Sequence, residues 1–470
     1  MKYSKKSVYR ISDNSYSSDE QEKLKLKITD HRKNNRDLKH TVESDKSKRV
    51  LSPVEYSQLT HYKQHGKSKK LRAKREINPH SAPAISSKFS IKSCVYSIKK
   101  GIKSYLNKVD FIFLFLVILI GFIGILAVHS GSMTDPAHRR IDTLQVFSFV
   151  LGISAIFFIP LFDVEEILKK WKLIYFINIL ILVITLFLGY SPTGEENKSW
   201  INLGFTSIQP AEFSKVLFIL SLSSHLENVK ERLNNLPVLM SVIFHGLSII
   251  GLVLAERDWG NCLVFIFIFL ILLFCANINY KYIFTGICSS VILFPLIWDN
   301  LGEFRKRRVL IGFDPELDPL GYGHQVIRSR NAIASGGLLG QGYLNGETIQ
   351  RTGGLFAQHT DMVFAVIGQE FGFIGCITLI FLFAFLIIRI ISIGSKAGNY
   401  FGGYVCCGVA GMFIFQFIIN IGMALGISPV VGITLPLVSY GTSSLISMYF
   451  SLALIMLVYS NSKSYSYKSI

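Results

Sequence analysis

The sequence lacks a cysteine framework. None of its seven cysteines pairs with another at the spacing of a zinc or redox motif with histidines nearby, and all except Cys94 stand in apolar runs. A disulfide-stapled domain and a zinc domain are therefore not expected, and the cysteines are interpreted as small buried apolar residues. No apolar signal-peptide core precedes residue 111, so a cleaved signal peptide is not expected either.

Most of the chain also lacks net charge. Residues 1–108 hold 27 of the 49 Lys and Arg and 10 of the 31 Asp and Glu. This tail carries +17 of the formal charge of +18, which leaves +1 for residues 109–470. Basicity belongs to the tail, so nucleic-acid binding by the rest of the chain is not expected.

The basic tail divides into two parts. Residues 1–90 are poor in aliphatic side chains and cannot bury enough apolar surface to fold alone, so we expect them to be mostly disordered. Residues 91–108 place apolar side chains at helical spacing among lysines, which predicts a juxtamembrane amphipathic helix on an anionic membrane face. A charged linker is the alternative.

Apolar residues are abundant. Half of the 470 residues are hydrophobic, and 36 are phenylalanine, which indicates an all-α polytopic membrane protein. Ten candidate transmembrane helices follow one another in a membrane domain of residues 109–470: 111–130, 143–162, 173–190, 209–225, 237–255, 259–276, 281–298, 363–391, 402–425 and 438–459. The fourth is the weakest, because Glu212 and Lys215 interrupt it.

Lysines and arginines in the short connections set the orientation. The tail and the connections after the second, fourth and eighth helices are basic and share one side, which the positive-inside rule assigns to the cytoplasm. Both termini are then cytoplasmic in a multi-pass membrane protein. Residues 300–361, between the seventh and eighth helices, form a large extracytoplasmic loop, since long loops escape this rule.

The loop Asn300–Asp361 is too long and polar for a plain connection. It has nine glycines between Gly321 and Gly354. Such a backbone can approach a ligand closely and offer its amides to anions. A flexible loop would explain the glycines, but not the nearby Arg328 and Arg330, which suggest an anionic ligand.

The loop ends in His359-Thr360-Asp361. Asp361 would suit a general base if its site excludes water. Alternatively, it caps a helix that starts at Met362. His359 is interpreted as a local hydrogen-bonding partner rather than a metal ligand, because no second ligand stands at a suitable spacing.

Three other unusual segments fall on the same side of the membrane. Glu212 and Lys215 are three residues apart and share a helix face, either as a buried ion pair that fixes packing or as part of a substrate site. Asp258 stands in the tight connection 256–260, where a plain polar turn is the alternative. Residues 428–444, which include Ser439, are rich in Pro and Gly and predict a re-entrant element.

Taken in order, these segments resemble one family. The motifs are Gln209-Pro210-Ala211-Glu212, Asp258-Trp259-Gly260, Asp314-Pro315-Glu316-Leu317-Asp318-Pro319-Leu320-Gly321, Ala332-Ile333-Ala334-Ser335-Gly336-Gly337, His359-Thr360-Asp361 and Ser439-Tyr440-Gly441. They resemble the SEDS family, the bacterial shape, elongation, division and sporulation proteins typified by RodA and FtsW. The resemblance covers roughly residues 109–460 and leaves out the basic tail.

The resemblance implies a peptidoglycan glycosyltransferase for cell elongation, shape or division. Such an enzyme polymerises lipid II, a disaccharide-pentapeptide on undecaprenyl pyrophosphate, into a growing glycan strand. Asp361 would be the essential base that deprotonates the 4-hydroxyl of the acceptor sugar, with inversion at the donor carbon. The substrate-binding residues expected from the motifs and the charges are Glu212, Lys215, Asp258, Arg328, Arg330, His359 and Ser439. Arginines, loop amides or a divalent cation, Mg or Mn, would meet the pyrophosphate charge. The implied partners are membrane lipids and a class B penicillin-binding protein, which is a transpeptidase.

The chain departs from the family pattern in four places. Ser199 replaces an arginine, Arg257 replaces a proline, Leu355-Phe356-Ala357 replaces Leu-Pro-Glu, and Gly441-Thr442-Ser443 replaces Gly-Gly-Ser. Two other functions stay open beside the enzyme: a lipid-linked precursor flippase and a non-catalytic scaffold for a transpeptidase. A flippase should carry polar groups through the membrane midplane, whereas the motifs here gather at the outer side.

Overall fold

The structure is a computed structural model. It describes residues 108–161, 164–191, 197–204, 207–300, 302–350, 355 and 357–468, which belong to one compact unit. The predicted disordered tail, Cys94 and all of the predicted helix 91–108 except Lys108 lie outside the described residues.

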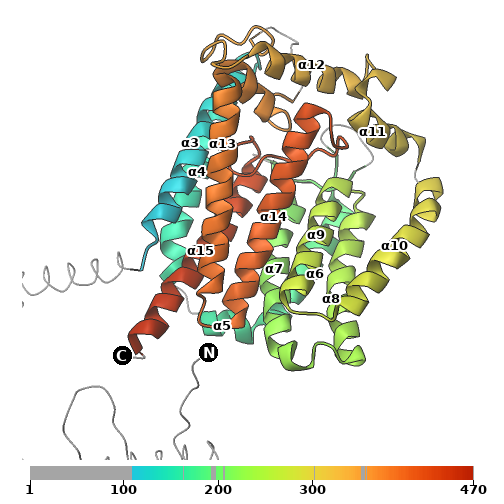
Figure 1. Ribbon diagram of the computed structural model, residues 1–470, viewed down its shortest axis with the longest axis vertical. Helices are drawn as coiled ribbons and strands as arrows, with labels where there is room; N and C mark the ends of the chain where they lie inside the picture. Colours follow the sequence, from blue (N-terminus) through green and yellow to red (C-terminus); the bar gives the residue numbers. More distant parts are fainter. Residues whose placement is uncertain are drawn as a thin grey trace, which may run out of the picture. The chain divides into compact units, whose positions relative to one another are not determined.

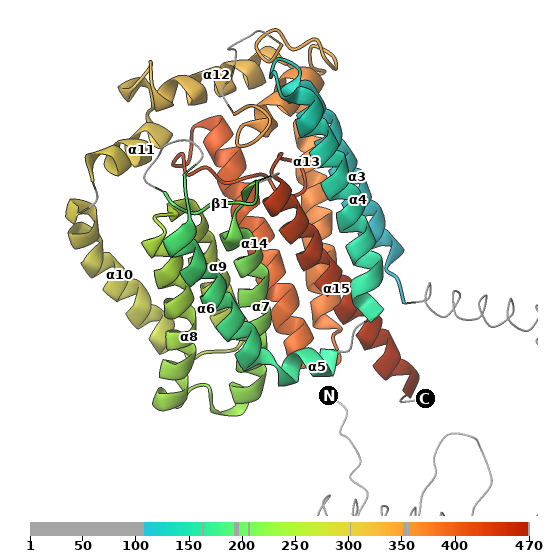
Figure 2. The same ribbon diagram turned by 180° about the vertical axis from the view of Figure 1, so that it is seen from behind.

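Long apolar helices form the bundle in Figures 1 and 2, and each of the ten predicted spans coincides with one of them. These helices are α3 (Phe111–Ser132), α4 (His138–Phe158), α6 (Trp171–Leu188), α7 (Pro210–Val229), α8 (Leu236–Ala255), α9 (Trp259–Cys275), α10 (Tyr280–Asn300), α13 (Val363–Ser395), α14 (Tyr400–Leu425) and α15 (Thr442–Lys468). A short helix, α5 (Val164–Lys169), precedes α6. The described part of the chain has only two strands, β1 (Ile201–Asn202) and β2 (Ser207–Ile208), which pair antiparallel. The all-α prediction is confirmed.

Seven helices of the described part are long and apolar enough to cross a membrane: α3, α4 with the 3-10 turn Ile159–Leu161, α6, α8, α13, α14 and α15. Of the others, α9 is apolar but has 17 residues, and the apolar part of α10 ends at Leu296. Helix α7 is 20 residues long and carries Glu212 and Lys215, as the sequence led us to expect. Large apolar side chains such as Phe187 and Phe244 are exposed on the outside of the bundle. This exposure suits contact with lipid rather than water.

The loop after α10 is folded, which the sequence analysis did not foresee. Helices α11 (Glu303–Phe313) and α12 (Tyr322–Ser335) lie across one end of the bundle, called the loop end below (Figure 1). A 3-10 turn, Pro315–Leu317, joins them. Ser329 of α12 donates a 2.8 Å hydrogen bond to the carbonyl of Ala424 near the end of α14. Much of the loop is therefore a packed cover for the bundle.

Helix α13 is broken at Gly372, whose φ of 65° and ψ of −163° suit a residue without a side chain. A break leaves carbonyl groups before it and amide groups after it without helical partners. The preceding loop supplies partners through four main-chain hydrogen bonds: Gln341 N–H to Gln369 O at 2.9 Å, Gly342 N–H to Glu370 O at 3.0 Å, Phe373 N–H to Gly337 O at 2.9 Å and Ile374 N–H to Leu338 O at 3.2 Å.

The hydrogen bonding between the loop and the broken helix depends on glycine. A Cβ on Gly336 would lie 2.0 Å from the carbonyl oxygen of Gly368, and one on Gly340 would lie 2.1 Å from that of Glu370. A Cβ on Gly372 would lie 2.3 Å from the amide nitrogen of Gly340. Several loop glycines thus serve the close approach of loop and helix, rather than flexibility.

Residues 428–441 join α14 to α15 as a non-helical segment. Leu437 and Val438 are buried, and the side-chain amide of Gln145 donates to Val438 O at 3.2 Å. Helix α3 comes close at Gly124, where a Cβ would lie 2.7 Å from Leu437 O. The predicted non-helical character is confirmed for residues 428–441, whereas residues 442–444 belong to α15. The re-entrant position of the segment stays a prediction, and burial by protein is the condition under which such backbone is tolerated at membrane depth.

Candidate active site

Helix α7 carries a buried ion pair close to its first turn. The Nζ atom of Lys215 lies 2.8 Å from Oε1 of Glu212, and the two residues are 0% and 5% exposed. Pro210 begins the helix, and Glu212 in the first turn is favoured by the positive end of the helix dipole. The predicted shared face of Glu212 and Lys215 is confirmed.

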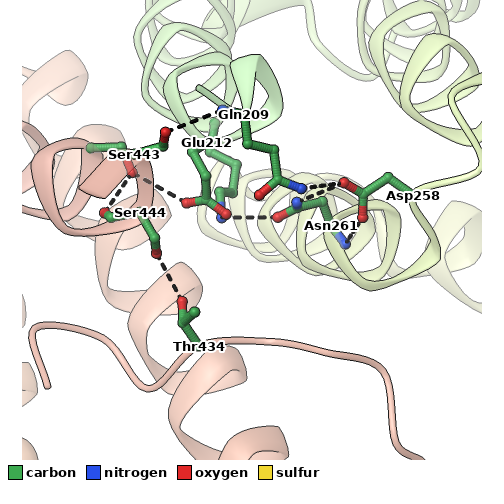
Figure 3. Close-up of polar contacts among 9 residues, drawn as sticks. Gln209, Glu212, Asp258, Asn261, Thr434, Ser443 and Ser444 are labelled. Carbon is green, nitrogen blue, oxygen red and sulfur yellow. Dashed lines mark hydrogen bonds and ion pairs between the residues drawn. The ribbon is translucent and has the colours of Figure 1, made fainter. Parts of the chain in front are cut away.

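Asn261 links this ion pair to Asp258 at the start of α9. Its side-chain oxygen accepts from Lys215 Nζ at 3.0 Å, and its side-chain nitrogen donates to Asp258 Oδ2 at 3.0 Å. Asp258 caps α9 by accepting from Asn261 N–H at 3.1 Å, and it also accepts from Gln209 Nε2 at 2.7 Å (Figure 3). Asp258 is thus a helix cap within a network, rather than part of a plain turn. Asn261 was not predicted from the sequence.

Serines at the start of α15 complete the network in Figure 3. Ser447 Oγ donates to Glu212 Oε2 at 3.3 Å, and Ser443 Oγ accepts from Gln209 N–H at 3.1 Å. Ser444 Oγ lies 2.8 Å from Thr434 Oγ1 in the 428–441 segment. We call Gln209, Glu212, Lys215, Asp258, Asn261, Ser443 and Ser447 the α7–α9–α15 cluster. It fixes three helix starts beneath the 428–441 segment.

The His359-Thr360-Asp361 motif is held by its three carbonyl groups. The His359 carbonyl accepts from Tyr440 N–H at 2.8 Å, and the Thr360 carbonyl accepts from Ser439 Oγ–H at 2.6 Å. The Asp361 carbonyl accepts from the side-chain amide of Asn420 in α14 at 2.8 Å. Two separate elements therefore fix the main chain of the motif, and the sequence analysis had identified only Ser439 as a site residue.

The turn before the motif ties it to the end of α3. Gln358 is buried, and its side-chain amide donates to Gly131 O at 2.7 Å. The carbonyl of Ala357 accepts from both Thr360 N–H and Met362 N–H at 3.1 Å. Ala357 has a φ of 55°, which is uncommon for a residue with a side chain.

Asp361 does not occupy the capping position. Helix α13 begins at Val363 with Met362 as its N-cap, so the capping alternative proposed from the sequence is not supported. The half-buried carboxylate faces the 428–441 segment, because a Cβ on Gly432 would lie 3.5 Å from Asp361 Oδ2.

The ring of His359 lies beside that of Tyr440, with the ring centres 5.6 Å apart. Burial lowers the pKa of His359, and the negative charge of Asp135 partly opposes this shift. Burial raises the pKa of Tyr440, which Arg140 opposes and Asp135 reinforces. Asp135 in the α3–α4 connection and Arg140 at the start of α4 thus influence the site, although nothing in their local sequence pattern marks them.

The predicted arginines lie on α12. Arg328 is half-buried and Arg330 is exposed. The side chain of Arg330 passes over the end of α14, since a Cβ on Gly426 would lie 3.2 Å from Arg330 Cδ. Helix α14 also carries Asn420. Helix α12 and the end of α14 therefore both belong to the loop end of the bundle.

The sequence pattern of the FtsW, RodA and SpoVE family of cell cycle proteins matches residues 109–464. The chain belongs to this family. It is 32% identical over 362 residues to the probable peptidoglycan glycosyltransferase FtsW of Wigglesworthia glossinidia brevipalpis, covering 74% of this chain and 92% of that relative. It is 33% identical over 338 residues to the peptidoglycan glycosyltransferase MrdB of Escherichia coli strain K12, covering 71% and 88%.

Solved structures of the FtsW, RodA and SpoVE family share the fold. A chain of a peptidoglycan synthase complex that coordinates polymerization and crosslinking matches with a TM-score of 0.65 and 28% identity, over 75% of this chain and 98% of that chain. The rod shape determining protein RodA of Thermus thermophilus matches with a TM-score of 0.56 and 25% identity, over 75% and 96%. The resemblance inferred from the motifs is confirmed.

The departure from the family pattern at Ser199 lies close to a buried acid, Glu256. Glu256 is 1% exposed, and neither carboxylate oxygen has a hydrogen-bond partner among the residues that the structure describes. Burial, and then the charge of Asp258, raise the pKa of Glu256 to about 8, so it is protonated at neutral pH. Its main-chain carbonyl accepts from Lys198 N–H at 3.2 Å, next to the buried Ser199 that replaces the family arginine.

Proposed function

We propose that this chain is a peptidoglycan glycosyltransferase that polymerises lipid II at the outer face of the bacterial cell membrane, with Asp361 as its general base. The observation that carries the assignment of Asp361 is the anchoring of all three carbonyls in His359-Thr360-Asp361. A general base must lie within hydrogen-bond reach of the proton that it removes. Anchoring the main chain of the motif on rigid elements can hold the Asp361 carboxylate within that reach.

The reaction needs one carboxylate. Asp361 takes the proton of the acceptor 4-hydroxyl, whose oxygen attacks the anomeric carbon of the donor sugar. The bond from that carbon to the pyrophosphate oxygen breaks with inversion, and undecaprenyl pyrophosphate leaves as an anion. Because a pyrophosphate leaves without protonation, no second acid is required. The lowered pKa of His359 favours a neutral ring that can donate or accept a hydrogen bond at this site.

The leaving pyrophosphate needs positive charge, and we assign this role to Arg328 and Arg330 of α12. Guanidinium groups bind phosphate oxygens in a bidentate geometry, which suits this leaving group. Mg or Mn would be the other source of charge. The described residues contain no group of three or more His, Cys, Asp or Glu that could hold a metal ion. The proposed mechanism therefore takes no step through a cation.

In this proposal the α7–α9–α15 cluster has a supporting role. Lys215 is fully buried, and its ammonium group already contacts Glu212 and Asn261. Of the two interpretations left open by the sequence, this arrangement favours an ion pair that fixes helix packing. The cluster positions the start of α15 and the 428–441 segment, and that segment holds the motif.

The test is polymerisation of labelled lipid II by the purified protein, alone and with a transpeptidase partner. We expect Asp361→Asn to abolish polymerisation, and Asp361→Glu to retain a fraction of it. Glu303→Gln is the matched control, because Glu303 is an exposed acid in the same loop that pairs with Lys306. Full polymerisation by Asp361→Asn would overturn the assignment of Asp361. Transport of labelled lipid II in liposomes without polymerisation by the unmodified protein would instead indicate a flippase.

The proposal includes an orientation and a partner. Both termini lie in the cytoplasm, and the loop end faces outward. Lys169, Lys170 and Lys172 then lie at the cytoplasmic end of the bundle, as the positive-inside rule requires. An impermeant thiol reagent on intact cells should label a cysteine placed at Glu303 and spare one placed at Lys396. The partner is a class B penicillin-binding protein, supported by the similarity to a chain of a synthase complex that coordinates polymerization and crosslinking.

A further inference from the structure

Asn420 of α14 is 0% exposed, and it connects two segments that the site depends on. Its side-chain nitrogen donates to the carbonyl of Asp361 at 2.8 Å and to the carbonyl of Ile433 at 2.7 Å. Its side-chain oxygen is buried without a partner among the described residues. The two protons of one primary amide are therefore used on two carbonyls, which a carboxylate or an apolar side chain could not reproduce.

The two carbonyls belong to the general base and to the segment that faces it. Ile433 directly follows Gly432, whose φ is 68°. A Cβ on Gly432 would lie 3.5 Å from Asp361 Oδ2. A single buried amide thus fixes the main chain on both sides of the gap between the carboxylate and the glycine.

This geometry matters for the chemistry. An acceptor hydroxyl must come within about 2.6–3.2 Å of a carboxylate oxygen to lose its proton. Glycine at position 432 keeps a side chain away from one flank of that carboxylate. The separation of Asp361 from Gly432 therefore affects how closely the hydroxyl can approach.

We infer that Asn420 is a positioning residue, which holds Asp361 opposite Gly432 and so sets the approach of the acceptor hydroxyl. This inference rests on the proposed role of Asp361 as general base. The competing possibility is that Asn420 only ties α14 to the 428–441 segment and stabilises the fold.

Steady-state kinetics separate these two roles. A misplaced base lowers kcat, and a displacement of about 1 Å can cost about 100-fold. For Asn420→Ala we expect kcat to fall by about 10- to 100-fold, with KM for lipid II changed less than about threefold. Asn420→Ser keeps one donor and should recover part of the loss.

Gln416 provides the matched control. It is a buried amide one turn earlier on α14, and its side-chain oxygen also lacks a partner among the described residues. Gln416→Ala should leave kcat within about threefold of the unmodified protein. Equal kcat losses in the two variants would indicate a structural role and overturn the inference.

Gly432→Ala tests the separation of Asp361 from Gly432 by changing the glycine. This variant tests the inference even if the Asn420 variants do not fold. The added methyl lies against the carboxylate, so kcat should fall by at least about tenfold in protein that still elutes as a single species. Unmodified kcat in Gly432→Ala would overturn the inference. Failure of the proposed function is distinguishable, because it would show as polymerisation by Asp361→Asn. Failure of this inference alone would leave that variant inactive and the Asn420 variants active.

Discussion

Asp258 and Glu256 stand two residues apart between α8 and α9, and their carboxylates have opposite surroundings. Asp258 accepts hydrogen bonds from Gln209 Nε2, Asn261 N–H and Asn261 Nδ2. Glu256 accepts none on its side chain from the described part of the chain, and burial beside Asp258 raises its pKa from 4.5 to about 8. Asp258 thus accepts from three donors of a network, while Glu256 is buried with its proton.

The stability of the protein should therefore depend on the protonation of Glu256. Because the folded-state pKa of Glu256 is raised, its protonated carboxyl group contributes its full advantage in folding stability below the unfolded-state pKa of 4.5. That advantage is lost as the pH rises toward about 8. Glu256→Gln should match the unmodified protein at about pH 4.5 and become more stable by up to a few kcal/mol near pH 8. Unfolding of the detergent-purified protein across this range measures the difference. A gain that does not vary with pH would contradict the assignment.

The Glu212–Lys215 pair can be tested by removing one partner or both. Lys215→Met leaves a buried carboxylate uncompensated and should destabilise the protein by about 3–5 kcal/mol. The double variant Glu212→Leu with Lys215→Met should recover much of that loss, because an apolar pair of similar volume can replace a buried ion pair. If polymerisation returns with stability, the pair serves packing. A stable but inactive double variant would show that the pair contacts substrate.

Gly124 should be intolerant of a side chain. A Cβ there would lie 2.7 Å from Leu437 O and Val438 Cα, and main-chain atoms cannot rotate away. Gly124→Ala should displace the 428–441 segment and lower both the melting temperature and kcat. Gly251 of α8 is the control, because a Cβ there has no atom within 4 Å. Gly251→Ala should raise stability by about 0.5–1 kcal/mol through helix propensity, without changing kcat. Equal effects at the two positions would contradict the close approach.

Ala357 offers a stabilising change beside the motif. Its φ of 55° is unfavourable for a residue with a Cβ, and glycine adopts it without strain. Ala357→Gly should raise the free energy of unfolding by about 0.5–1 kcal/mol, reduced by the greater entropy of glycine in the unfolded chain. Ala365→Gly within α13 is the opposite control and should lower stability. A loss of stability in Ala357→Gly would contradict the observed backbone.

Seven of the ten helices were predictable because a long apolar run dictates a membrane-length segment, whereas α7 carries charges and α9 and the apolar part of α10 are shorter. Helical spacing also put Glu212 and Lys215 on one face without knowledge of the fold. Asn420 and Asn261 were missed for a physical reason: a lone amide in an apolar run gives no sign of its partner. The Asp361 carbonyl lies 59 residues from Asn420 in the sequence, and only the folded chain joins them.

The loop was predictable in position but not in structure. Its mixed composition resembled an irregular connection, whereas α11 and α12 gain their stability by packing on the end of the bundle. The break in α13 was hidden because residues 363–391 form one apolar run. The roles of Asp361, His359, Arg328 and Arg330 stay predictions, since they depend on a substrate that neither pattern nor packing describes.

The interruption of α13 at Gly372 also constrains how this protein is made. A segment that enters the bilayer with a gap in its helix exposes unsatisfied main-chain groups to hydrocarbon, at a cost of several kcal/mol each. The chain that satisfies them, residues 337–342, precedes α13 in the sequence and is therefore synthesised before it. Biosynthesis from the N-terminus delivers the two parts in that order. The broken helix and the loop that precedes it therefore depend on one another, and a deletion within residues 337–342 should destabilise α13.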